Sequence, residues 1–572
     1  MENIRQTVKR VWGYDALLPL QAEAIGAVLA RRDSIVILPT GGGKSLCYQA
    51  PAAAMGRLAV VVSPLIALMK DQVDGLTAAG VPAAFLNSSL TAEERRVVEA
   101  GVARGRYHLL YVAPERLVLP SCLGLLRRAG VAFFAIDEAH CISQWGHDFR
   151  PEYRQLSVVR EVFPDVAIHA FTATATPRVR TDIATELTLR NPAILVGSFD
   201  RPNLVYRVRP RTDRLRQVTE ALERHRGAAG IIYCIRRTEV DQLAEALRRR
   251  GYRAVAYHAG LADAERRRAQ DDFITERAEV VVATVAFGMG IDRSDVRYVI
   301  HAGMPKSIEH YQQEAGRAGR DGLPSECLLL YSGGDFGLWR SILVAEGLPA
   351  PGALPKLGEM YDYCQGTACR HRVLVEYFGQ AYGADPCGAC DVCLGEIAVE
   401  DGSTALARQI LACVVEMGER FGADYVADVL RLARDEGEYP TLGVTARGHR
   451  VLRGEDTVPL LRTVARSPRG APSRPARPAV PSRDPSGTSD EDLFETLRAL
   501  RRTMAEERGI PPYLIFSDAT LRELARERPA TEEAFLQIKG VGLRKLQELG
   551  PRFLACIRKY GDGSAGDTSP VP

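Results

Sequence analysis

Residues 136–153 read Ile-Asp-Glu-Ala-His-Cys-Ile-Ser-Gln-Trp-Gly-His-Asp-Phe-Arg-Pro-Glu-Tyr. The apolar run Val131–Ile136 leads into this stretch and predicts a buried strand. A strand that ends in Asp137-Glu138 delivers two carboxylates to the carboxyl edge of a parallel sheet, where open α/β folds bind ligands. We predict that Asp137 holds the Mg²⁺ of a bound nucleotide through water and that Glu138 polarises the attacking water.

A loop rich in aromatic residues follows the acidic pair within a dozen positions. It carries the side chains that a stacking surface for nucleic-acid bases requires, which are Trp145, His147, Phe149 and Arg150. The alternative interpretation is a helix start capped by acids and followed by core aromatics. The rest of the chain favours the first interpretation.

The composition is that of an ordinary globular protein. At 572 residues, with 46% apolar and 25% charged residues, the chain predicts three to five domains rather than one core. No apolar run approaches the ~20 residues that span a bilayer, and Met1–Gln6 lack the apolar segment of a signal peptide. We expect a cytoplasmic protein without a membrane partner, associated with the nucleoid if bacterial. The formal charge of +3 is too small to indicate nucleic-acid binding, so any basic surface must be local.

Two α/β blocks come first, over residues 1–202 and 203–340. Strand-like runs alternate with helix-length segments, which predicts parallel sheets with helices on both faces. The expected strands are Ser34–Leu38, Ala59–Val62, His108–Val112, Ala132–Ile136 and Ala167–Thr172, then Gly230–Cys234, Arg253–Tyr257, Val280–Thr284, Val296–His301 and Cys327–Tyr331. A helical, Cys-rich segment (341–400), a compact segment (401–465), a Pro- and Arg-rich linker (466–488), a helical domain (489–560) and a disordered tail (561–572) follow.

The first block opens with a Gly-rich loop, Pro39-Thr40-Gly41-Gly42-Gly43-Lys44-Ser45. Consecutive glycines let backbone N–H groups close around phosphates. Lys44 can reach the β- and γ-phosphates, and Ser45 can coordinate Mg²⁺. The first Gly of the common phosphate-loop pattern is replaced by Leu38, and the alternative is a simple Gly-rich turn.

The second block carries Gln313-Glu-Ala-Gly-Arg-Ala-Gly-Arg320. We expect Arg317 and Arg320, three residues apart, to share one helical face and to stabilise the charge on a γ-phosphate across the cleft. A solvated basic helix is the alternative. Asp292, in a Gly-rich turn, is expected to face the same cleft. In the first block, the hydroxyls of Thr172–Thr176 are expected to bond to the acidic pair.

Four of the twelve cysteines have the spacing of a metal site. Cys387, Cys390 and Cys393 lie at two-residue gaps, and Cys369 can supply a fourth thiolate. Four sulfurs suit tetrahedral Zn²⁺, whereas four free core thiols are the alternative.

Taken in order, these segments resemble the motifs of superfamily 2 helicases, and the aromatic-rich loop after Asp137-Glu-Ala-His140 is similar to that of the RecQ family. The resemblance covers about residues 10–460 and 489–560. It implies an ATP-driven 3′→5′ DNA helicase with two RecA-like lobes, acting in repair, recombination and replication. Its cofactors would be ATP, Mg²⁺ and Zn²⁺. Its partners would be single-stranded and forked DNA, with single-strand-binding protein and recombination factors, and it would act as a monomer.

The resemblance also assigns roles by position. Lys44, Ser45, Asp137, Glu138, Gln313 and Arg320 match the ATP site, and Trp145, Phe149 and Arg150 match the loop that couples DNA contact to hydrolysis. The adenine-binding segment resembles Trp12-Gly13-Tyr14 with Gln21, whose amide can pair with the base. The family usually has an Arg three residues before that Gln, and here the residue is Leu18.

The C-terminal regions match the family less closely. Residues 401–465 resemble a winged helix that lacks its recognition-helix portion between Val426 and Glu438, so we expect weaker duplex contact. Residues 489–560 resemble an HRDC domain, with a Gly540-Val-Gly542 turn at a helix start where a phosphate can bind. With 13 basic and 12 acidic residues, this domain is expected to contact protein as readily as DNA.

Two other functions remain open at this point. One is an RNA-directed superfamily 2 helicase, which the four-cysteine site and the aromatic-rich loop argue against. The other is a DNA-binding or strand-annealing protein with weak hydrolysis, which the intact Lys44, Glu138 and Arg320 argue against.

Overall fold

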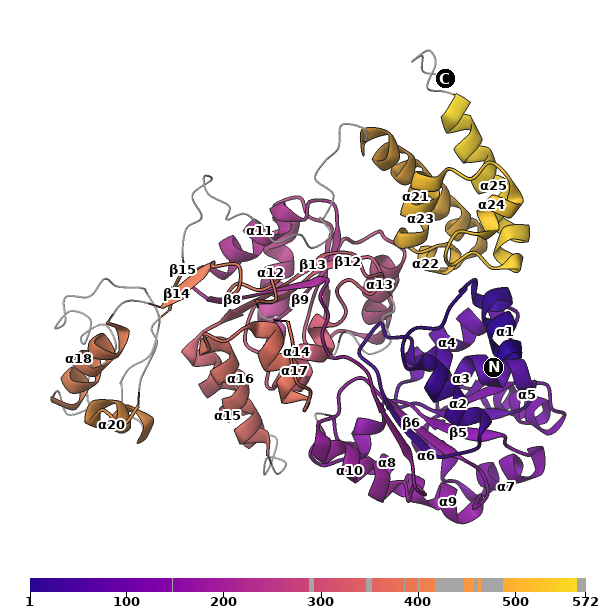
Figure 1. Ribbon diagram of the computed structural model, residues 1–572, viewed down its shortest axis with the longest axis horizontal. Coiled ribbons are helices and arrows are strands. Elements are labelled where there is room, and N and C mark those ends of the chain that lie inside the picture. The colour runs from indigo at the N-terminus through magenta and orange to yellow at the C-terminus, as the bar shows by residue number, and fades with distance from the viewer. Residues whose placement is uncertain are drawn as a thin grey trace.

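The computed structural model describes residues 1–146, 148–285, 287, 293–345, 352–384, 386–399, 402–416, 444, 446–456, 461–463 and 487–562. Two α/β lobes lie side by side, and a helical unit formed by the C-terminal residues lies against them (Figure 1). The predicted fold class, two lobes built on parallel sheets, is confirmed.

The first lobe is built on a seven-stranded sheet in the order β3-β4-β2-β5-β6-β1-β7, with every pairing parallel. Its strands are β1 (Ser34–Ile37), β2 (Ala59–Val62), β3 (Ala83–Leu86), β4 (Leu109–Val112), β5 (Phe133–Ile136), β6 (Ile168–Thr172) and β7 (Ala193–Val196). The helices are α1 (Glu2–Trp12), α2 (Gln21–Leu29), α3 (Lys44–Met55), α4 (Ile66–Ala78), α5 (Ala92–Ala103), α6 (Pro114–Leu117), α7 (Pro120–Ala129), α8 (Pro151–Arg154), α9 (Val158–Val162) and α10 (Pro177–Glu186), with 3-10 turns at Ala139–Ile142 and Gln155–Ser157.

The second lobe has a six-stranded sheet, again parallel throughout, in the order β10-β11-β9-β12-β13-β8. Its strands are β8 (Leu204–Pro210), β9 (Ala229–Tyr233), β10 (Ala254–Tyr257), β11 (Val280–Ala283), β12 (Val296–His301) and β13 (Ser325–Tyr331). The helices are α11 (Arg214–Arg224), α12 (Arg237–Arg249), α13 (Asp263–Ile274) and α14 (Ile308–Ala315).

All ten strands expected from the sequence are present, with ends shifted by at most two residues. Three further strands of these two sheets were missed, and each lies at the edge of its sheet: β3, β7 and β8. The interior strands β1, β2, β4 and β5 are buried along their whole length, so they are continuous apolar runs. The edge strands alternate between more and less buried residues, or are partly exposed throughout, and therefore lack such a run.

The helical, Cys-rich segment extends the second lobe. It contains α15 (Gly333–Ala345), α16 (Ala353–Gln365) and α17 (Arg370–Tyr377). Beyond it, β14 (Ile397–Val399) pairs antiparallel with β15 (Leu461–Thr463), and α18 (Ser403–Glu416) packs on α20 (Ala446–Arg453) away from the lobes (Figure 1). The predicted gap in the winged helix, 426–438, lies outside the described residues, as do residues 466–486 of the linker and 563–572 of the tail.

The C-terminal unit is all-helical, as predicted. It consists of α21 (Gly487–Arg508), α22 (Pro512–Ile515), α23 (Asp518–Glu527), α24 (Glu532–Leu536) and α25 (Leu543–Asp562) around its own apolar core. Helix α21 begins in what was expected to be linker, and α25 extends two residues into the expected tail.

This helical unit contacts both lobes. Arg501 and Arg502 of α21 both pair with Glu276, which follows α13 of the second lobe. The Arg502 guanidinium lies 2.7 Å from the Glu276 carboxylate. At the first lobe, Gly540 N donates to Gly13 O at 3.3 Å, and Arg544 donates to Thr77 O at 3.3 Å. The Gly540-Val-Gly542 turn, expected to be open to a phosphate, is therefore covered by the end of α1. A Cβ on Gly542 would lie 3.1 Å from the carbonyl oxygen of Arg10.

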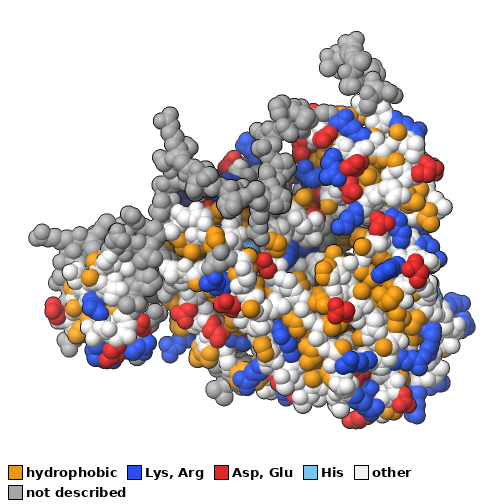
Figure 2. Space-filling model, in the orientation of Figure 1, with side chains coloured by type: hydrophobic (Ala, Val, Ile, Leu, Met, Phe, Trp, Pro, Cys, Tyr) orange, Lys and Arg blue, Asp and Glu red, His pale blue; other side chains and the backbone are white. Residues whose placement is uncertain are grey.

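Basic and acidic side chains are interspersed over the face of the molecule seen in Figure 2. Among the described residues, no helix has the length and apolar character needed to cross a membrane.

Candidate functional site: a cleft between two lobes, an aromatic-rich loop and a four-cysteine cluster

The Gly-rich loop joins β1 to α3 and is shaped by its glycines. Gly41 and Gly43 have φ of +83° and +72°, a region that side chains with a Cβ rarely adopt. Lys44 and Ser45 open the twelve-residue helix α3, so free backbone N–H groups and the positive end of the helix dipole point into the loop. The Lys44 amine donates to Leu38 O at 3.4 Å. The loop thus has the donors and the charge that bind phosphate.

The acidic pair lies at the carboxyl end of β5, as predicted. The Tyr153 hydroxyl donates to the main-chain oxygen of Asp137 at 2.9 Å, and the Tyr48 hydroxyl to its carboxylate at 3.4 Å. Burial, and then the charge of Glu138, raise the pKa of Asp137. Burial would also raise the pKa of Glu138, but the hydrogen bond with His140 and the charge of Lys44 outweigh it and lower this pKa. Glu138 is therefore held ionised, as a group that orients water must be.

The Thr-rich end of β6 contacts the acidic pair through His140, and not directly as expected. His140 Nδ1 lies 2.8 Å from the Thr172 hydroxyl and 3.3 Å from a carboxylate oxygen of Glu138. Burial opposes protonation of this imidazole, but Cys141 and Glu138 raise its pKa to about 10. The protonated ring bridges the hydroxyl and the carboxylate. The backbone N–H of Thr174 completes the link by donating to the Thr172 hydroxyl at 3.3 Å.

Arg317 and Arg320 do not share a helical face, and this prediction was wrong. Helix α14, which carries Gln313, ends at Ala315, and the two arginines lie in the turn that follows. Gly316 caps the helix, and Gly319, with φ of +55°, has a backbone conformation that favours glycine. The turn still brings both arginines to the cleft. The charge of Arg317 acts on Glu138, and a Cβ on Gly41 would lie 3.7 Å from Cα of Arg320.

Sequence reasoning missed Arg201, which touches both sides of the cleft. Its guanidinium donates to Thr40 O of the Gly-rich loop at 2.7 Å. It also donates to three main-chain oxygens of the arginine turn, those of Gly316, Ala318 and Gly319, at 3.4, 3.0 and 2.9 Å. Its place in the Asp200-Arg-Pro-Asn203 connection between the lobes was the only available signal.

The predicted adenine segment lies beside the Gly-rich loop. The side-chain amide of Gln21 donates to Gly42 O and Gly43 O at 3.3 and 3.2 Å, and its oxygen accepts from Leu18 N at 2.7 Å. Tyr14 is exposed, just after the end of α1. Asp292 lies outside the described residues.

The aromatic-rich loop packs its side chains against protein. The Trp145 ring lies under the Arg178 guanidinium. The centroid of the Phe149 ring lies 5.5 Å from Cζ of the Arg154 guanidinium. Arg150 turns back into the first lobe, where it donates to Pro64 O at 3.0 Å and pairs with Asp148. His147 lies outside the described residues.

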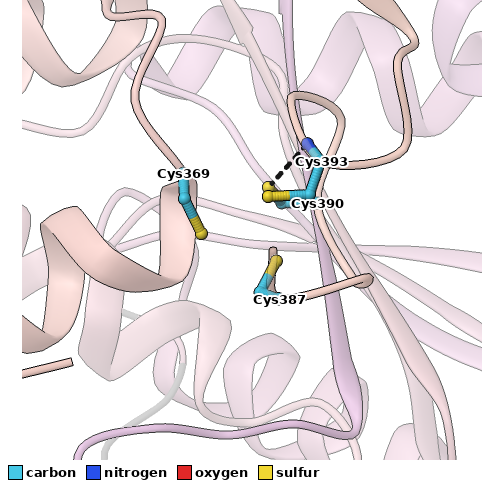
Figure 3. Close-up of side chains that lie close together, drawn as sticks. All are labelled: Cys369, Cys387, Cys390 and Cys393. Carbon is cyan, nitrogen blue, oxygen red and sulfur yellow. Dashed lines mark hydrogen bonds between the residues drawn. The ribbon is translucent and has the colours of Figure 1, made fainter. Parts of the chain in front are cut away.

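The four predicted zinc ligands converge. The sulfurs of Cys369, Cys387, Cys390 and Cys393 all lie within 4.8 Å of one another, and they come from the start of α17 and from the loop before β14 (Figure 3). Backbone N–H groups support two of the sulfurs, with Ala389 N donating to Cys387 and Cys393 N to Cys390 at 3.3 and 3.4 Å. Four thiolates at this spacing fit a tetrahedral Zn²⁺.

We next compared the whole chain with known proteins. The chain is 40% identical to the ATP-dependent DNA helicase RecQ of Haemophilus influenzae, over 97% of this chain and 95% of that protein. It is 39% identical to the ATP-dependent DNA helicase RecQ of Bacillus subtilis, over 96% and 97%. The chain belongs to the RecQ helicase family.

Models of the parts of a RecQ helicase match in chain order. These are the DEAD/DEAH box helicase (18–183), the helicase conserved C-terminal domain (213–322), RecQ zinc-binding (343–394), the RQC domain (397–436) and the HRDC domain (490–557). The RecQ-like DNA helicase BLM of Xenopus laevis shares 43% identity over 66% of this chain and 29% of its own length. The chain is therefore an ATP-dependent DNA helicase, and its cysteine cluster lies within the residues that match the RecQ zinc-binding model.

Proposed function

We propose that this RecQ helicase uses ATP with Mg²⁺ to move 3′→5′ along single-stranded DNA and to unwind the duplex ahead. The RecQ resemblance supports the polarity. The observation that carries the ATP site is the meeting of three elements at one cleft, since the Gly-rich loop, the acidic pair and the arginine turn lie together there. A small space between them is lined by Thr40, Thr174, Arg201, Gln312 and Gly316.

In this proposal each element of the cleft has one task. The backbone of Gly41–Gly43 and the amine of Lys44 bind the phosphates, while Ser45 and Asp137 hold Mg²⁺. Mg²⁺, when bound, neutralises charge on the phosphates. Glu138 orients the attacking water.

From the second lobe, Gln313 contacts the γ-phosphate, and the guanidiniums of Arg317 and Arg320 stabilise the charge that builds up during transfer. Tyr14 and Gln21 contact the adenine.

The aromatic-rich loop is proposed to bind single-stranded DNA and to report its presence to the ATP site. Trp145, His147, Phe149 and Arg150 follow Glu138 by no more than twelve residues, and Arg150 N is bonded to Cys141 O at 2.9 Å. A movement of the loop is therefore passed to the turn that holds His140 and Glu138.

Lys44→Ala tests the ATP site. We expect DNA-stimulated ATP hydrolysis to fall at least ~10³-fold, because the positive charge on the phosphates is lost, while the melting temperature stays unchanged. Lys559→Ala, at an exposed position late in α25, is the matched control and should retain full activity. Turnover of Lys44→Ala within a few-fold of the wild-type rate would refute the assignment.

A comparison of DNA substrates tests the direction of movement. Unwinding of forked and 3′-tailed duplexes, with little activity on 5′-tailed or blunt ones, is the expected result. ATP hydrolysis stimulated more strongly by single-stranded RNA than by DNA would favour the RNA-directed alternative. We propose further that the protein acts as a monomer in repair, recombination and replication, with single-strand-binding protein and recombination factors as partners.

A further inference from the structure

Trp145, in the aromatic-rich loop, is held by contacts from two parts of the molecule. The guanidinium of Arg178 in α10 lies over its ring, with Cζ 3.2 Å from the ring centroid. From the other side of the cleft, Gly352 before α16 comes so close that a Cβ there would lie 2.9 Å from ring atom Cζ3. The surface that would stack on a base is thus engaged within the protein.

Lys356, near the start of α16, holds the main chain of Trp145. Its amine donates to the carbonyl oxygen of Trp145 at 2.6 Å and pairs with Glu309 of α14, also at 2.6 Å. Glu309 is 3% exposed. The first contact is a short hydrogen bond from a charged donor, and the second is a short ion pair that lies where little water weakens it.

The partner of Lys356 lies on α14, the helix that carries Gln313. Glu309 precedes Gln313 by four residues, so the two lie on one side of α14, and that helix leads directly into the arginine turn. The charge of Lys356 also acts on a second carboxylate, Glu359, but burial and then the charge of Glu309 outweigh it and raise the pKa of Glu359. Removing the cation from a buried carboxylate costs free energy. The ion pair of Lys356 with Glu309 is therefore stronger than its interaction with Glu359.

We propose that Lys356 is a positioning residue that latches the aromatic-rich loop to α14 when no DNA is bound. This inference rests on the proposed role of the loop in DNA binding. For Trp145 to stack on a base, its ring must leave Arg178 and Gly352, and its carbonyl must leave Lys356. Single-stranded DNA has to overcome these contacts, and the ATPase stays low until it does.

Lys356→Met removes the charge and keeps the length of the side chain. Without DNA, we expect ATP hydrolysis to rise about fivefold, and the DNA concentration for half-maximal stimulation to fall by a similar factor. The maximal rate with DNA should stay within about twofold of wild type. Lys356→Arg keeps a cation that can reach both oxygens and should behave as wild type. Glu309→Gln, an isosteric change, should shift both quantities in the same direction as Lys356→Met.

Tryptophan fluorescence tests the latch without relying on activity. The chain has three tryptophans, so Trp12→Phe with Trp339→Phe leaves Trp145 as the only one. In this background, Lys356→Met should make Trp145 more accessible to acrylamide in the absence of DNA, and Lys356→Arg should not. Unchanged quenching in Lys356→Met overturns the latch, as does a loss of DNA-stimulated rate with no rise in the DNA-free rate. If wild-type hydrolysis does not respond to single-stranded DNA, the proposed function fails, and quenching still decides the latch.

Discussion

Arg201 donates four hydrogen bonds to main-chain oxygens, one in the Gly-rich loop and three in the arginine turn. Main-chain oxygens are present at every residue, so no motif identifies the partners of this side chain. Its planar guanidinium, with several donors in fixed directions, can serve both sides of the cleft at once, which an amine or amide cannot do.

We predict that Arg201→Gln lowers kcat about tenfold or more and changes the KM for ATP little, because the arginine turn loses its fixed distance from the Gly-rich loop. Steady-state ATPase kinetics with saturating single-stranded DNA measure this. Asn203→Asp is the matched control, since the Asn203 amide donates to Gly319 O and Leu323 O but not to the Gly-rich loop. An equal loss of kcat in both variants would mean that the shape of the turn matters and the bridge does not.

At the scale of elements, the cysteine cluster ties the zinc-binding segment to the edge of the second sheet. Asp391, fully buried between two ligands in sequence, accepts from Val208 N of β8 at 2.8 Å and from Arg370 of α17 at 3.0 Å. Tyr206 N of β8 donates to Ala389 O at 3.1 Å. The zinc loop therefore covers the backbone of an edge strand, which would otherwise remain open to pairing.

We expect about one zinc per chain and, on its removal by a strong chelator, a fall in melting temperature of about 10 °C, because metal binding supplies folding energy to this segment. Cys390→Ser should bind little zinc. Cys364→Ser is the control, because Cys364 is buried in the same segment but lies outside the cluster, and it should keep the metal. A chain that purifies without zinc and melts normally would contradict the assignment.

The aromatic-rich loop gives a second prediction at this scale. Trp145→Ala should retain basal ATP hydrolysis. The stimulation of its hydrolysis by single-stranded DNA should fall at least about tenfold, since base stacking is lost. Arg150→Ala is less specific than the sequence suggested, because Arg150 is bonded to Pro64 O and would also disturb the first lobe. If single-stranded DNA stimulates ATP hydrolysis by Trp145→Ala as fully as in wild type, the loop serves only in packing.

At the scale of the whole molecule, the C-terminal helical unit contacts both lobes. On the first lobe it touches Gly13, in the segment predicted to bind adenine. Glu276 is 7% exposed and meets Arg498, Arg501 and Arg502 of α21. Burial would raise the pKa of Glu276, but the charges of Arg501 and Arg293 outweigh it and lower this pKa. The contact is therefore present above the usual pKa of a glutamate and is lost as the pH falls through the lowered value.

Glu276→Gln should weaken this docking by about 3 kcal/mol, because three arginines lose a buried counter-charge. The measurement is the radius of gyration in solution, which should increase as the C-terminal unit leaves the lobes. Glu279→Gln is the matched control, since Glu279 lies three residues away and pairs with Arg253 on the second lobe instead. A radius unchanged by Glu276→Gln would mean that the contact with Gly13 holds the unit alone.

The sequence by itself determined the strands of both sheet interiors, the Gly-rich loop between β1 and α3, the acidic pair at the end of β5 and the cluster of four cysteines. Each of these depends on neighbours in the chain, either as an apolar run or as a fixed spacing of functional groups. The tertiary structure alone decided the edge strands β3, β7 and β8, the end of α14 before Arg317, and the contacts of Arg201, Lys356 and Glu276. These depend on which segments meet in space, and an edge strand or a long polar side chain has the same local sequence whether or not a distant partner is present.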